Sequence, residues 1–155
     1  MANNDVLRSI RDALNLDEAT MIQIFKEAGR EVGGSAIAAF LKTADEDDYI
    51  PCSNPIMGFF LDGLIIHYRG KKEGGTAPAA PPLTELSNNA ILKKLRIALD
   101  LKEDDLTGIF KLAGIDLARH ELTALFRKPG NSHYKECTDH LLSVFIRGVG
   151  LRPKD

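Results

Sequence analysis

Three residues with metal-binding or nucleophilic side chains lie close together near the end of the sequence. His133, Cys137 and His140 are spaced by four and three residues, and on one continuous helix this spacing brings all three to one face. A thiolate and two imidazoles there could hold zinc, or a histidine could activate the thiol. Thr138, however, is a typical first residue of a helix, which leaves Cys137 in the preceding loop. We therefore favour a buried structural cysteine and predict no metal, cofactor or catalytic residue.

A second group of side chains could bind phosphate. Residues 113–128 are expected to form a turn at Gly114 followed by a short helix, which together with the helix before them has the outline of a helix-turn-helix. Nucleic-acid binding by this helix is the alternative interpretation of function, and two packed helices joined by a turn is the simpler one. The candidate residues are Arg119, His120, Arg127 and Lys128.

Two further basic residues occupy matching places in the sequence. Arg11 and Arg96 each lie in an otherwise apolar helix and are each followed seven residues later by a glutamate. Such an arginine could bind an anion or a carboxylate of a partner. We favour an ion pair at the rim of the core, in which the guanidinium reaches a local acid.

Motifs typical of enzymes are absent from the sequence. It contains no Gly-Lys-Ser/Thr phosphate loop, no Gly-x-Gly-x-x-Gly, no Gly-x-Ser-x-Gly and no His-Glu-x-x-His. We therefore predict that the protein is not an enzyme.

The elements that carry these residues occur twice. Residues 3–70 align without a gap with 88–155 at an offset of 85, and 18 of the 68 positions are identical, where chance would give roughly 4. We infer a tandem duplication, with repeats at 1–70 and 88–155. Residues 71–87, rich in Gly, Pro and Ala, are predicted to be a flexible linker.

The spacing of apolar residues predicts four helices in each repeat and an all-α fold. At 68 residues, each repeat is large enough for a modest core, and we expect each to enclose one of its own. Gly63 and Gly148, inside the last helix of each repeat, indicate that another helix approaches closely there. Gly29 is the expected end of a helix. Helix starts are expected in the first repeat at Asn4, Asp17, Ser35 and Ser53, and the corresponding boundaries in the second at Asn89, Asp100, Gly114 and Thr138.

Several of these motifs resemble those of the YehS-like bacterial family. They are Asn-Asn-x-[Val/Ile]-Leu-[Arg/Lys]-x-[Ile/Leu]-Arg-x-Ala-Leu, Ile-Phe-Lys-x-Ala-Gly, and Cys-[Ser/Thr]-[Asn/Asp] before the last helix. The resemblance covers both repeats, with Pro55 and His140 as local departures. It implies a duplicated helical architecture. The family has no assigned activity, so the resemblance supplies no functional residues.

Composition limits the class of protein. Of the 155 residues, 44% are hydrophobic and 27% are charged, which excludes a wholly disordered chain. No apolar run is long enough for a membrane span, and residues 1–5 lack the features of a signal peptide. Two cysteines are too few for a disulfide framework. We therefore expect a cytoplasmic protein, and the family resemblance implies a bacterial one.

Charge is divided unevenly between the repeats. Residues 1–70 contain 6 basic and 11 acidic residues, a net charge of −5, whereas residues 88–155 contain 12 and 9, a net charge of +3. Opposite charges favour packing of the repeats against each other about a pseudo-two-fold axis. We predict a non-catalytic helical interaction module that takes a protein partner or small ligand in grooves between helices or repeats. The alternative is nucleic-acid binding by the basic second repeat.

Overall fold

A computed structural model describes residues 1–70 and 86–153 of the chain. Within these ranges it contains helices and no strands, so the predicted all-α class is confirmed. The linker predicted at 71–87 lies, except for its last two residues, outside the described residues. The helices are α1 (Asn3–Leu14), α2 (Glu18–Glu27), α3 (Gly34–Phe40), α4 (Asn54–Arg69), α5 (Asn88–Ala98), α6 (Glu103–Leu112), α7 (Arg119–Leu125) and α8 (Asp139–Leu151).

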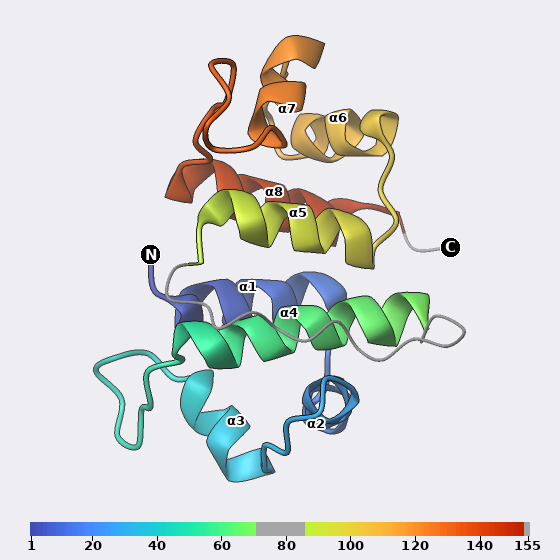
Figure 1. Ribbon diagram of the computed structural model, residues 1–155. Helices are drawn as coiled ribbons and strands as arrows, with labels where there is room; N and C mark the ends of the chain where they lie inside the picture. Colours follow the sequence, from blue (N-terminus) through green and yellow to red (C-terminus); the bar gives the residue numbers. More distant parts are fainter. Residues whose placement is uncertain (71–85, 154–155) are drawn as a thin grey trace.

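The first and last helices of both repeats form the centre of the molecule (Figure 1). Helices α2 and α3 cover this centre on one side, and α6 and α7 cover it on the other. Helix α1 packs far more extensively on α8 than on α4, the last helix of its own repeat, and α5 likewise packs mainly on α4. The repeats therefore dock, as expected. The first helix of each repeat packs on the last helix of the other repeat, which is an exchange of helix partners.

One continuous hydrophobic core results from this exchange. Buried side chains of both repeats belong to a single cluster, and α1, α5 and α8 contribute Ile10, Leu95 and Ile146 to a small apolar cavity near its centre. The expectation that each repeat encloses a core of its own is therefore wrong. The reason is that α1 and α5 turn their apolar faces toward the other repeat.

Within each repeat, the last helix packs closely on the second helix. A Cβ atom added to Gly63 would lie 2.1 Å from the Ile24 carbonyl oxygen, and one added to Gly148 would lie 2.3 Å from that of Ile109. Both glycines thus permit the close helix approach that the sequence predicts. Beside these contacts, the ring centroids of Phe25 and Phe60 are 5.5 Å apart, and those of the matching pair Phe110 and Phe145 are 5.3 Å apart.

Helix starts follow the sequence prediction only in part. The side chains of Asp17, Ser53 and Thr138 accept hydrogen bonds from the first turn, as predicted. The predictions for Asn4, Asn89, Ser35 and Asp100 are wrong. The N-cap residues, which directly precede those helices, are Ala2, Ser87, Gly33 and Lys102, respectively. Asp100 instead has a left-handed φ of 51° just after α5, a conformation typical of a helix end.

Asn4 and Asn89 are inside their helices because their amides bind distant backbone. The Asn4 Nδ2 donates to the carbonyl oxygens of Phe40 (3.0 Å) and Ile50 (2.9 Å), and its Oδ1 accepts the Cys52 N–H (2.9 Å). Asn89 makes the matching three bonds, each 2.9 Å long, to Leu125, Lys135 and Cys137. Each asparagine therefore fastens the loop between the third and fourth helices of its repeat.

Candidate functional site

Helix α7 presents a polar face to solvent. Leu122 and Leu125 are buried against the core, whereas Arg119, His120 and Thr123 are exposed. The helix begins where the Glu121 carboxylate accepts the Ala118 N–H at 3.1 Å. This bond lowers the pKa of Glu121, so that the carboxylate remains charged at neutral pH.

A loop is held against this helix and brings further basic side chains. The Lys135 N–H donates to the Ala124 carbonyl oxygen at 3.1 Å, and the Lys135 carbonyl oxygen is bound by Asn89. Two backbone bonds thus fix Lys135 beside α7. His133 lies in the same loop, where its N–H donates to the Asn131 side chain at 2.8 Å.

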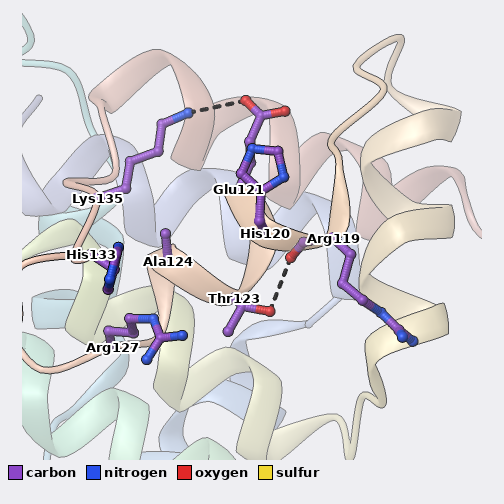
Figure 2. Close-up of a pocket in the computed structure, with 8 residues that line it drawn as sticks. All are labelled: Arg119, His120, Glu121, Thr123, Ala124, Arg127, His133 and Lys135. Carbon is purple, nitrogen blue, oxygen red and sulfur yellow. Dashed lines mark hydrogen bonds and ion pairs between the residues drawn. The ribbon is translucent and has the colours of Figure 1, made fainter.

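Helix and loop together enclose an open cavity of about 670 Å³, which we call the basic cavity (Figure 2). Lys135 extends from the loop toward Glu121, while Arg127 and His133 lie next to each other away from that pair. The lining residues are Arg119, His120, Glu121, Thr123, Ala124, Arg127, His133 and Lys135.

The cations of the basic cavity are only partly neutralised. Lys135 Nζ lies 3.5 Å from a carboxylate oxygen of Glu121, and Arg119 Nε lies 3.5 Å from one of Glu103. Within residues 1–70 and 86–153, the guanidinium of Arg127 has neither a hydrogen bond nor an ion pair. The cavity therefore holds an available positive charge, which makes it suitable for an anionic group.

A smaller cavity of about 260 Å³ shares Thr123 and Arg127 with the basic cavity and also includes Arg96. Arg96 already has partners within its own repeat. Its guanidinium lies over the Phe126 ring, 4.7 Å from the centroid, and its Nε donates to the Leu101 carbonyl oxygen at 3.1 Å. Its counterpart Arg11 pairs with the neighbouring Asp12 at 2.9 Å. The two arginines named from the sequence thus have separate local partners.

The first repeat has no comparable cluster of cations. The positions that match Arg119 and His120 are Gly34 and Ser35, and those that match His133 and Lys135 are an aspartate and an isoleucine. Lys42, at the position of Arg127, donates to the Asp47 carbonyl oxygen at 2.9 Å. The basic cavity therefore belongs to the second repeat alone, although the two repeats share one fold.

The structure brings together some of the basic residues proposed from the sequence. Arg119, His120 and Arg127 line the basic cavity, whereas Lys128, exposed and next in the chain, is not among its lining residues. Sequence reasoning missed the contribution of His133 and Lys135. The signal that could have found them is the run of basic residues within 127–135.

The cysteine-centred cluster is not brought together. Cys137 is buried, whereas His133 lines the basic cavity and His140 lies in α8. No group of three metal ligands occurs among the described residues. Burial raises the pKa of Cys137 to about 11 and that of Cys52 to about 12. Neither thiol is therefore a ready nucleophile at neutral pH.

Comparisons with known proteins agree on a family. A family described as "Protein of unknown function (DUF1456)" matches residues 3–70 and again residues 88–153, once for each repeat. The chain is 37% identical over 152 residues to a protein of Escherichia coli (strain K12) described as "Uncharacterized protein YehS", which covers 98% of this chain and 96% of the relative. No solved structure matches the chain.

None of the described helices is both long and apolar enough to cross a membrane. The matches on both repeats reproduce the duplication seen at the offset of 85. The chain therefore belongs to the YehS-like family of unknown function, DUF1456.

Proposed function

We propose that the protein is a non-catalytic binding module whose second repeat takes an acidic segment of a partner protein in the basic cavity. The observation that carries this proposal is the guanidinium of Arg127, which has no partner in the part of the chain that the structure describes and lies in a cavity lined by two further cations, Arg119 and Lys135. A carboxylate side chain offers the matching geometry and charge.

The fold does not require these charges. The first repeat forms the same helices with Gly34 and Ser35 where the second has Arg119 and His120. Folding of the second repeat therefore does not require these basic residues. This asymmetry supports a binding role for the second repeat.

A short acidic segment suits the molecule better than a long polyanion. The first repeat has a net charge of −5 and repels an extended phosphate backbone. A segment that enters only the basic cavity avoids most of this repulsion, because screening weakens charge interactions beyond about 10 Å at ordinary salt.

Nucleic-acid binding is the second candidate function. The observation that favours it is the spacing of Arg119, Thr123 and Arg127, which lie four residues apart and are all exposed. Arg119 and Thr123 lie in the second helix of a helix pair, and Arg127 lies two residues beyond its end. In a helix-turn-helix protein this second helix carries the base contacts. With seven residues, however, α7 is only about 10 Å long.

Non-catalytic function and a reducing cytoplasmic location are part of the proposal. Both cysteines are free, buried thiols, which supports a structural role and a reducing compartment. A relative in Escherichia coli supports a bacterial source.

The test is fluorescence anisotropy of the full chain with a labelled Asp- and Glu-rich peptide, run beside single- and double-stranded oligonucleotides. We expect the peptide to bind at low salt and the double variant Arg127→Ala/Lys135→Ala to weaken binding about tenfold or more, ~1.4 kcal/mol. Lys42→Ala is the matched control, since it removes a cation at the same position of the first repeat. Oligonucleotide binding with the same mutational response, and none by the peptide, would favour the second candidate. Absence of both would refute the proposal.

A further inference from the structure

A second concave site lies where the two repeats meet. Helices α1 and α8 run side by side (Figure 1), and between them is a groove of about 520 Å³, which we call the inter-repeat groove. Helix α1 contributes Ser9, Asp12 and Ala13 to its lining, and α8 contributes Val144, Arg147 and Gly150 among others. It shares no lining residue with the basic cavity.

Because the chain is duplicated, α5 and α4 form an interface that matches the one between α1 and α8. The two interfaces can therefore be compared position by position. Lys94 and Asp62 occupy there the positions of Ser9 and Arg147. The Lys94 Nζ lies 2.5 Å from the Asp62 Oδ1, and the Asp62 side chain is only 6% exposed. An ion pair thus bridges the α4–α5 interface.

Among the described residues, the α1–α8 interface has no such ion pair at the matching positions, although the amino group of Met1, just before α1, pairs with Asp139 of α8 at 2.7 Å. The Ser9 hydroxyl donates to the Asp5 carbonyl oxygen of its own helix, and Arg147 donates to the Ala113 carbonyl oxygen at 3.1 Å. Asp12, the acidic residue of the lining, is paired with Arg11. Arg147 therefore lines the groove as a cation with no carboxylate partner among the described residues.

Two apolar side chains are also smaller on the α8 side. The positions of Phe59 and Ile65, which pack against the core in α4, are Val144 and Gly150 in α8. The difference removes a ring and a branched side chain from the same place in a matched interface. At Gly150 the two helices come close together, since a Cβ atom added there would lie 3.1 Å from the Ala13 Cα. The groove that remains is bordered by Val144 where α4 has the ring of Phe59.

From these observations we propose that the inter-repeat groove binds a small carboxylic acid with an apolar body. The carboxylate pairs with Arg147, and the body rests on Ala13, Val144 and Gly150. The volume falls within the usual range of small-molecule sites. A single planar guanidinium matches a carboxylate, whereas the carboxylate of Asp12 at the rim opposes a more highly charged anion. The site is independent of the proposed function of the basic cavity.

The experiment is NMR titration of the ¹⁵N-labelled full chain with 3-phenylpropionate, and with 3-phenylpropanol as the uncharged analogue. We expect saturable shifts centred on Ala13, Val144 and Gly150 with the acid, and affinity for the alcohol at least about tenfold weaker. Arg147→Gln should reduce affinity for the acid by a similar factor, and Lys26→Gln, which removes an exposed cation of α2 outside both cavities, should not change it.

A second variant copies the matched interface. Ser9→Lys/Arg147→Asp introduces the ion pair of Lys94 and Asp62 into the groove, and should abolish binding while circular dichroism shows retained helicity. Arg147→Gln changes a single exposed side chain. If the double variant fails to fold, the comparison of Arg147→Gln with the unchanged protein therefore still decides the proposal. Equal affinity for acid and alcohol, shifts centred on α7, or no saturable shift up to the solubility of the probe would overturn the proposal.

Discussion

At the scale of single residues, the buried asparagines connect the sequence to the architecture most directly. Asn4 is 3% exposed and binds backbone groups of residues 36, 46 and 48 positions away. Its amide makes the hydrogen bonds that water would otherwise make to the carbonyl groups of Phe40 and Ile50 and to the N–H of Cys52. Asn89 does the same for the loop that carries Lys135, so it also shapes one wall of the basic cavity.

We expect Asn4→Ala to lower the free energy of unfolding by about 3 kcal/mol or more, because it leaves three buried or partly buried backbone groups without a partner. Urea denaturation followed by circular dichroism measures this change. Gln23→Ala, at an exposed position of α2, is the control and should change stability by less than about 0.5 kcal/mol. A loss below about 1 kcal/mol for Asn4→Ala would show that the loop does not depend on this side chain.

The two cysteines give a prediction about reactivity. Burial raises the pKa of Cys52 to about 12 and that of Cys137 to about 11, and only the thiolate reacts. At pH 8 we expect alkylation by iodoacetamide to be at least about a hundredfold slower in the folded protein than in urea. Mass spectrometry after timed quenching measures both rates. Similar rates would mean that the thiols are accessible in the native state.

At the scale of helices, glycine positions decide how closely the elements approach. Gly63 and Gly148 lie within helices, where glycine costs about 1 kcal/mol relative to alanine. Each nevertheless faces the backbone of the second helix of its repeat at a distance that no Cβ atom tolerates. Gly108, inside α6, faces open space instead.

Substitutions by alanine should therefore have opposite effects at these positions. Gly148→Ala forces α8 away from α6 and should destabilise the protein by about 2 kcal/mol or more. Gly108→Ala gains helix propensity without a clash and should stabilise it by about 0.5–1 kcal/mol. Thermal denaturation of both variants under one condition provides the comparison. Changes in Tm of the same sign for both variants would contradict the packing described for Gly148.

Local signals in the sequence predicted much of this level of structure. The helix pattern, the capping side chains of Asp17, Ser53 and Thr138, and the close approach at Gly63 follow from neighbouring residues alone. The start expected at Asn4 was wrong because its amide binds groups far away in the sequence, which no local pattern reveals. Arg119, His120 and Arg127 of the basic cavity are among the residues named from the sequence. The place of Lys135 beside them depends on its backbone bonds to Ala124 and Asn89, which are distant in the sequence.

At the scale of the whole molecule, the exchange of partners between repeats determines stability. The first helix of each repeat packs mainly on the last helix of the other, so that neither repeat contains its complete core. The duplication was predictable from the sequence, whereas docking was a hypothesis based on the opposite net charges of the repeats. Which helix packs on which was not predictable, because matching apolar faces in the two repeats permit several pairings.

We expect residues 1–70 and residues 88–155, expressed separately, to lose most of their helicity and cooperative unfolding. Mixing them should restore both, because the complementary faces are then present together. Circular dichroism and sedimentation velocity measure the recovery and the complex. Two halves that each unfold cooperatively and do not associate would contradict a shared core.

The pairing of α1 with α8 and of α5 with α4 also has a consequence for ancestry. A chain with only one repeat could build these interfaces by forming a homodimer, in which symmetry makes both interfaces identical. Fusion into a single polypeptide replaces that bimolecular step with an intramolecular one, at a high effective concentration. It also frees the two interfaces to diverge, so that one of them can carry an ion pair where the other has a groove.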